Sequence, residues 1–128
     1  MANKISAIKI KIKDGVATVR MAFSHPMMTY NQAKAKTGNR NDANFITHIT
    51  AKVGDAVVLD ASTSQFFSKN PIFLFNFTCE TFKIGKVLSG REIDQGIERK
   101  ESDKGDFLTV IATDLQGNSY EKSQELTY

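Results

Sequence analysis

Strict alternation of apolar and charged side chains is the feature that most constrains the fold of this chain. In the segment IKIKIK, residues 8–13, isoleucine and lysine alternate at every position. Side chains of a β-strand point to opposite faces in turn, so this pattern predicts a strand with its isoleucines toward a core and its lysines in water. An Asp14-Gly15 turn and a second alternating run from Val16 to Phe23 come next. Together, the two runs predict a β-hairpin.

Similar alternation recurs along the rest of the chain, with turn signals between the runs. The expected strands Phe45–Val53 and Ala56–Leu59, joined by a Gly54-Asp55 turn, form a second hairpin. Further strands are expected over Ile72–Cys79, Phe107–Thr113 and Ser119–Tyr128. About seven strands separated by turns such as DLQGN, residues 114–118, predict an all-β fold, an immunoglobulin-like β-sandwich of antiparallel strands. We expect the aromatic run 72–79 to be a central strand of its sheet.

Two polar segments interrupt this pattern. Residues 29–44 are rich in Asn, Lys and Gly and have no sustained period, which predicts a long surface loop. Residues 83–104 hold six basic and five acidic residues, and their pattern leaves open a short helix or an extended hairpin. The length of 128 residues fits one compact domain.

Composition and charge exclude several classes of function. The net charge of +3 comes from 17 basic and 14 acidic residues that are scattered along the chain. Nucleic-acid-binding proteins concentrate their positive charge, so no nucleic-acid partner is expected. No run of about 18 apolar residues is present to span a membrane. The single cysteine, Cys79, excludes an intramolecular disulfide and a zinc ribbon.

The segment FSHPMMTY, residues 23–30, gathers residue types that often carry chemistry. A blue-copper site is excluded, because no histidine lies beyond Cys79. Met27 and Met28 would bind a soft metal only if several thioethers converged, so we expect them to pack or to form an exposed contact surface. His25 is expected to hydrogen-bond at the end of a strand.

The other candidate residues also favour structural roles. His48 shares a strand face with Thr50 and Lys52, so it is expected to face solvent. Cys79 shares its face with three phenylalanines, where a thiol behaves as a small apolar group. We therefore expect no catalytic, cofactor-binding or metal-binding residues, and a protein that is not an enzyme.

Several segments together resemble the SoxZ family, the smaller subunit of the SoxYZ sulfur-carrier complex of thiosulfate oxidation. The resemblance rests on His25-Pro26-Met27 at a strand end, Phe45-Ile46 opening the next strand, Ser68-Lys69-Asn70-Pro71 before the aromatic strand, and the final turn from Asp114 to Ser119. It covers most of the chain and implies a single domain over residues 1–128. Residues 83–104 depart from the family pattern and are insertion-like.

This resemblance implies a non-catalytic scaffold without a cofactor. In this family, SoxY carries sulfur intermediates on a cysteine in its glycine-rich C-terminal tail. The implied assembly is a heterodimer with SoxY, which transiently binds the enzymes SoxAX, SoxB and SoxCD. When the chain is isolated, the surface that would bind SoxY is free to form a homodimer instead. His25, Pro26, Met27 and Met28 are expected to shape the surface that faces SoxY or the enzymes that process its tail, without bonding to the substrate. The segment MANKISAIKI lacks the features of a secretory signal, so nothing in it would export the chain by itself. The resemblance implies export to the periplasm, folded with a signal-bearing SoxY, and the missing signal agrees with this expectation.

Two alternatives remain at this level. His-Pro-Met also occurs in superoxide reductases, which share an immunoglobulin-like sandwich but bind iron through four histidines and a cysteine. This chain has two histidines, so that alternative is a degenerate metal enzyme. The second alternative is a generic adhesive or carbohydrate-binding sandwich.

Overall fold

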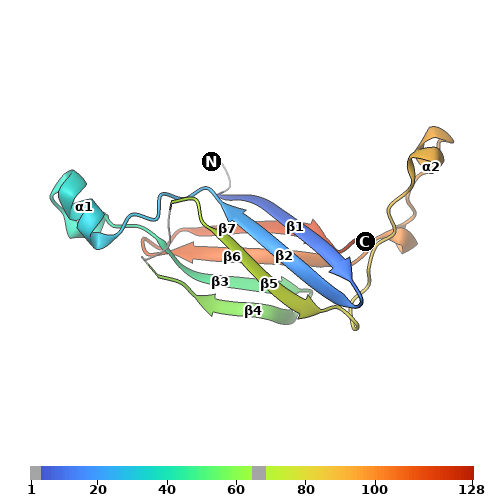
Figure 1. Ribbon diagram of the computed structural model, residues 1–128, viewed down its shortest axis with the longest axis horizontal. Coiled ribbons are helices and arrows are strands. Elements are labelled where there is room, and N and C mark those ends of the chain that lie inside the picture. Colours follow the sequence, from blue (N-terminus) through green and yellow to red (C-terminus); the bar gives the residue numbers. More distant parts are fainter. Residues whose placement is uncertain (1–3, 65–68) are drawn as a thin grey trace.

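Seven strands and four short helices make up the computed structural model, which describes residues 4–64 and 69–128 (Figure 1). In chain order the elements are β1 (Ile5–Lys13), β2 (Val16–Phe23), α1 (Tyr30–Thr37), η1 (Arg40–Asp42), β3 (Ile46–Val53), β4 (Ala56–Ser62), β5 (Ile72–Thr78), α2 (Gly90–Asp94), η2 (Glu101–Asp103), β6 (Phe107–Asp114) and β7 (Ser119–Glu125). The elements labelled η are 3₁₀ helices. Of the residues on which the resemblance rests, Ser68 lies outside the described part of the chain.

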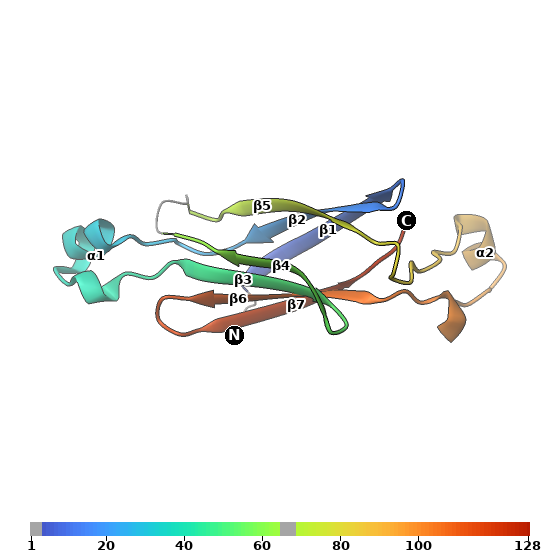
Figure 2. The same ribbon diagram turned by 90° about the horizontal axis from the view of Figure 1, so that it is seen from below.

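Two antiparallel sheets form the layers of the molecule. One sheet has the strand order β1-β2-β5 and the other has the order β4-β3-β6-β7. Figure 2 shows the two sheets stacked face to face. Both expected hairpins are present, and each lies within one sheet, with β1 paired to β2 and β3 paired to β4. The all-β sandwich fold predicted from the alternation is therefore confirmed.

The core lies between the inward faces of the two sheets. Val19, Met21 and Phe23 of β2 are buried there, as the alternation predicts. β6 supplies a matching row from the opposite sheet, and this row consists of Leu108, Val110 and Ala112. Burial of these apolar side chains is the main stabilising contribution in a domain of this size.

The alternation predicted for β3 fails near its start. Ile46 and Ile49 are both buried, although a strict period of two would place them on opposite faces. A register shift between Ile46 and His48 in the pairing with β6 accounts for this, because an irregularity of one residue reverses the side-chain direction.

β5 is an edge strand, so its expected central position is wrong. Among the described strands it pairs with β2 alone, and its outward residues Ile72 and Leu74 are 50% and 68% exposed. Its inward face carries Phe73, Phe75 and Phe77, which pack on the core. The apolar residues on both faces of β5 suggested a central strand, but only its inward face is covered by the other sheet.

Residues 29–44 contain α1 and η1, where the sequence predicts an irregular loop. Thr29 caps α1: its hydroxyl accepts a hydrogen bond from the Gln32 N–H, and the Gln32 side chain accepts one from the Thr29 N–H. Gly38 ends the helix at φ 83°, in the left-handed region that favours glycine. Ala33 is the only buried residue of α1, all of which the structure describes, so the helix lacks the apolar stripe that reveals most helices in a sequence.

Residues 83–104 contain the short helices α2 and η2, which decides between the two structures left open for this segment. In Figures 1 and 2, α1 and α2 project from opposite ends of the sandwich. Within residues 4–64 and 69–128, no helix combines the length and the apolar character needed to cross a membrane.

Candidate functional site

The candidate site lies where the chain leaves β2 and runs toward α1, along residues 24–29, which we call the corner segment. Pro26 is exposed at its tip and restricts both its own φ and the conformation of His25. Met27 comes next with φ 50°, in the left-handed region. The backbone of Met28 then pairs with that of Asn44 through two hydrogen bonds of 2.7 and 3.0 Å. These constraints hold the corner segment in a defined path.

His25 belongs to the corner segment, and its side chain is buried, with only 1% of its surface exposed. Its Nδ1 accepts a hydrogen bond of 3.0 Å from the Met27 N–H, so the proton of the neutral ring is on Nε2. That Nε2 lies 3.6 Å from Oδ2 of Asp114. The expectation that His25 hydrogen-bonds at the end of a strand is confirmed.

Asp114, at the end of β6, is the centre of a buried polar cluster. Its Oδ2 accepts hydrogen bonds from Tyr120 Oη at 2.6 Å, from Asn44 Nδ2 at 3.0 Å and from Asn118 Nδ2 at 3.1 Å. Its Oδ1 accepts another from the Asn118 N–H at 2.9 Å. We call the residues His25, Asn44, Asp114, Asn118 and Tyr120 the polar cluster. It joins the end of β2, the start of β3 and the β6–β7 turn.

The electrostatics of the polar cluster keep an anion at its centre. Burial raises the pKa of Asp114, but the hydrogen bonds from Tyr120, Asn44 and Asn118 outweigh burial and leave that pKa below 3.8. Burial, together with the bond to Asp114, raises the pKa of Tyr120 to about 12. Burial also lowers the pKa of His25 below 6.5, although Asp114 acts in the opposite direction. Near neutral pH the cluster therefore holds a carboxylate, a neutral imidazole and a protonated phenol.

The polar cluster stabilises the fold, and its buried groups are not accessible to a reactant. His25 and Asp114 are almost completely buried, and the hydrogen-bonding groups of Asp114 are used within the chain. A general base must reach the proton that it removes, and neither residue is open to an incoming molecule. The cluster instead holds three chain segments together at one end of the sandwich.

The two methionines of the corner segment have different environments. Met27 is 2% exposed and belongs to the core, and its Sδ accepts a hydrogen bond of 3.4 Å from the Ile46 N–H. Met28 is half-buried. Of the two roles expected for the methionines, packing or an exposed contact surface, Met27 therefore has the first, and the left-handed backbone at this residue goes with an inward side chain.

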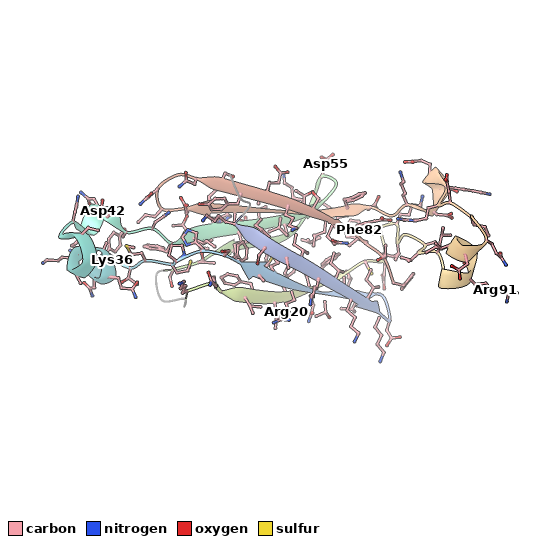
Figure 3. The ribbon with its side chains drawn as sticks, turned by 90° about the horizontal axis from the view of Figure 1, so that it is seen from above. Arg20, Lys36, Asp42, Asp55, Phe82 and Arg91 are labelled. Atoms are coloured by element: carbon pink, nitrogen blue, oxygen red, sulfur yellow. The ribbon has the colours of Figure 1, made fainter. Side chains whose placement is uncertain are left out.

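A shallow pocket of about 510 Å³ opens beside the corner segment and α1. Its lining residues are Pro26, Met28, Gln32, Ala35, Lys36 and Lys69. The lining is apolar at Pro26, Met28 and Ala35 and basic at its two lysines, and none of the described lining residues is acidic. Figure 3 labels Lys36 on α1 at this end of the molecule. Of the four residues expected at an interface, Pro26 and Met28 thus reach the surface, whereas His25 and Met27 support it from below.

The remaining candidates lie apart from this site. His48 is half-exposed on β3 and bonds through Nε2 to Asp60 of β4, as its expected solvent-facing position allows. Cys79 is buried in the core with Phe77, which confirms its expected environment. Sequence reasoning missed Asp114, because an Asp that opens a run such as DLQGN is also an ordinary turn residue. The role of Asp114 is visible only in the folded chain, where Tyr120 and Asn44 both donate hydrogen bonds to its carboxylate.

The residues present do not fit the iron site of the superoxide-reductase alternative. His25 follows the C-terminal end of β2, whereas the Cys79 N–H bonds to Gly15 O next to the N-terminal end of that strand. His25 and Cys79 therefore lie at opposite ends of β2 and do not meet at one metal site. His48 lies on the outer face of the other sheet. In the described part of the chain, no three side chains of His, Cys, Asp or Glu gather closely enough to hold a metal ion.

Solved structures share this fold at low sequence identity. A hypothetical protein, PH1083, from Pyrococcus horikoshii OT3 matches with a TM-score of 0.52 at 14% identity, over 94% of this chain and 85% of that one. A superoxide reductase from Nanoarchaeum equitans matches with a TM-score of 0.52 at 13% identity, over 96% and 93%. A variant of the superoxide reductase (neelaredoxin) from Archaeoglobus fulgidus, in its reduced form, matches with a TM-score of 0.54 at 14% identity, over 98% and 89%. At these identities the likeness concerns the fold alone.

Sequence comparison identifies the family. No curated protein matches the chain. The sequence pattern of the family described as sulphur oxidation protein SoxZ matches residues 6–88, which include nearly all of β1, the strands β2 to β5, the corner segment and α1. The matched span is well over half of the 128 residues and contains the pocket. The chain therefore belongs to the SoxZ family of sulphur oxidation proteins.

Proposed function

We propose that this protein is the non-catalytic subunit of a SoxYZ carrier complex and supports SoxY, whose tail cysteine carries sulfur intermediates during thiosulfate oxidation. The observation that supports a scaffold most directly is the burial of the His25 side chain against Asp114, because it uses the polar groups of the corner segment to hold that segment in place. The corner segment lies within the span that matches the SoxZ family. The most polar part of the site is used to fix the corner segment, and the surface above it is a shallow apolar and basic pocket.

In this proposal the corner segment and its pocket face SoxY. Pro26 and Met28 supply apolar contacts, and an unbranched thioether adapts readily to a partner surface. His25 and Met27 keep that surface in place from beneath. The assembled heterodimer acts in the periplasm, to which SoxY would bring both chains, and there it meets SoxAX, SoxB and SoxCD transiently. An isolated chain has the same surface open to a homodimer.

Two matched substitutions test the site. Met28→Ala should weaken association with SoxY by roughly 1–2 kcal/mol and leave the fold almost unchanged, because Met28 is only half-buried in the free chain. Met27→Ala should lower the free energy of unfolding by about 2–5 kcal/mol, because Met27 is a core residue. Titration calorimetry with purified SoxY and denaturant unfolding give the two quantities.

Co-expression with SoxY and size measurement test the function itself. We expect a one-to-one complex that persists at micromolar concentration. A chain that stays monomeric beside SoxY would contradict the proposal, and stoichiometric iron in the purified protein would favour the superoxide-reductase alternative. If SoxY binds equally well to the Met28→Ala variant, the complex forms through another surface.

A further inference from the structure

Although the basic residues are scattered along the sequence, four of them lie together on the outer face of the β1-β2-β5 sheet. Lys9, Lys11 and Lys13 alternate outward along β1, and Arg20 projects from β2. In the pairing of these strands, Lys9 lies directly opposite Arg20. We call these four residues the cationic face, and Figure 3 labels Arg20 on it.

These four charges lack a compensating carboxylate in the part of the chain that the structure describes. Within residues 4–64 and 69–128, no ion pair joins the cationic face to a carboxylate. The remaining outward residues of the three strands are small, apolar or neutral. Like charges directly opposite one another destabilise a sheet, so the pairing of Lys9 with Arg20 brings the isolated fold no benefit.

Exposed apolar side chains continue this surface at the edge strand. Leu74 of β5 lies opposite Arg20 and is 68% exposed, and Ile72 lies opposite Ala22 and is 50% exposed. The surface therefore combines cations on β1 and β2 with an apolar rim on β5. Apolar contact area of this kind fits a protein surface better than it fits a nucleic-acid backbone, which is recognised mainly through charge.

The outer face of the other sheet differs in its charge. There His48 bonds to Asp60, and Lys52 of β3 shares the face with Glu121 of β7. Both signs of charge are thus interspersed on the four-stranded sheet, whereas the three-stranded sheet presents one sign. The two outer faces of the sandwich therefore differ in the sign of the charge that they present.

We infer that the cationic face is a docking surface for the acidic surface of an enzyme that acts on the carried sulfur. This inference rests on the proposed function and adds a second interface to it. Interfaces of permanent complexes are depleted in lysine and rich in apolar contact, so a lysine row suits a transient partner better than SoxY. Uncompensated surface charge accelerates the encounter with a partner of opposite sign and lets the complex dissociate again.

A charge-reversal pair tests the inference in the assembled heterodimer with SoxY. The face variant carries Lys9→Glu and Lys11→Glu. The control variant carries Lys52→Glu and Lys100→Glu, which change the net charge equally but lie on β3 and next to η2. Association with SoxAX, SoxB and SoxCD from the same organism is measured by surface plasmon resonance, from about 50 to about 500 mM NaCl.

For at least one of these enzymes, we expect the face variant to associate about tenfold or more slowly at low salt, while the control behaves as the wild type. The wild-type rate should fall toward that of the face variant as salt is added. SoxY should bind both variants with unchanged affinity, so that a failure of the proposed function remains separately visible.

Other outcomes overturn the inference. Binding of none of the enzymes, equal behaviour of the two variants, or loss of SoxY from the face variant would each contradict it, and the last result would make this face the heterodimer interface. A DNA duplex and vesicles containing phosphatidylglycerol serve as further anionic probes. If the face variant loses binding to one of those probes but to no enzyme, the partner is not a protein and the inference is wrong.

Discussion

At the scale of single residues, His25 and Asp114 show how burial and hydrogen bonding together determine protonation. Both are almost completely buried, yet burial prevails for the imidazole and hydrogen bonds prevail for the carboxylate. Asp114 accepts from Tyr120, Asn44 and Asn118, whereas the Nε2 atom of His25 is 3.6 Å from Oδ2 of Asp114. The depressed pKa of the histidine has a direct consequence for stability.

Stability should fall on mild acidification because of His25. Below about pH 6.5 the unfolded chain takes up a proton that the folded chain, with its lowered His25 pKa, does not bind, so the free energy of unfolding decreases. Asp114 acts in a separate range, because its stabilising contribution is lost only as the pH falls below about 3.8. Tyr120, with its pKa raised to about 12, stays protonated in both ranges.

Denaturant unfolding between pH 7 and pH 5 measures this effect. His25→Asn keeps an acceptor for the Met27 N–H and removes the titration, so the variant should show a flatter dependence of stability on pH than the wild type. His48→Asn is the matched control, because its imidazole lies on the outer face of the sandwich. Parallel pH profiles for His25→Asn and the wild type would show that His25 is not the group responsible.

At the scale of elements, the sequence predicts the strands that obey a simple period. Both hairpins and the strands β6 and β7 are predicted by alternation, because one face of each strand meets a single core. Alternation misses α1, because the stability of this helix comes from the caps at Thr29 and Gly38 instead of an apolar stripe. It misses the polar cluster for a related reason: Asn44 and Asp114 are 70 residues apart, and no local pattern links them.

We call residues 86–104 the arm, and we call the region around Gly85 and Gly105, where both ends of the arm meet the sandwich, its base. The close packing of this base is also not predicted by any local sequence pattern. Gly85 pairs with Thr127, and Gly105 lies against it. A Cβ added to Gly105 would lie 2.5 Å from Leu126 O and 2.9 Å from Lys83 O, and even closer to Gly85 N. These neighbours are backbone atoms that hold the ends of the arm against the sandwich, so they have little freedom to move.

Gly105→Ala should therefore lower the free energy of unfolding by roughly 1–3 kcal/mol. Gly90→Ala is its control, because no atom lies within 4 Å of the added Cβ at the first residue of α2. That control should be neutral or slightly stabilising, since alanine favours a helix more than glycine does. Thermal and denaturant unfolding would show the difference, and equal stability of the two variants would mean that the base of the arm adapts freely.

At the scale of the whole molecule, the sandwich separates two projections with different connections to the core. α1 lies next to the corner segment and the pocket, within the span that matches the SoxZ family. The arm projects from the other end and lies almost entirely beyond residue 88, where that match ends. It exposes apolar side chains at Val87, Ile93 and Ile97.

The base of the arm carries the bonds that tie it to the sandwich. The Asp106 N–H donates to Lys83 O and the Lys83 N–H donates to the Asp106 carboxylate, each at 2.9 Å, and Arg99 forms a two-fold bond with Glu125 of β7. The bond to Arg99, together with the Gly105 N–H, lowers the pKa of Glu125 to about 2. The tip, residues 88–98, contributes none of these bonds, so the sandwich should fold without it.

Replacing residues 88–98 with a glycine–serine linker of equal length should thus leave cooperative unfolding and association with SoxY almost unchanged. Arg99→Ala, a single substitution at the base, should lower stability more than the loss of the whole tip, because it leaves the Glu125 carboxylate without its cation. Thermal unfolding of the two variants, each in complex with SoxY and alone, makes the comparison. If the linker variant unfolds without cooperativity while Arg99→Ala does not, the arm is part of the folding unit and the sandwich depends on its tip.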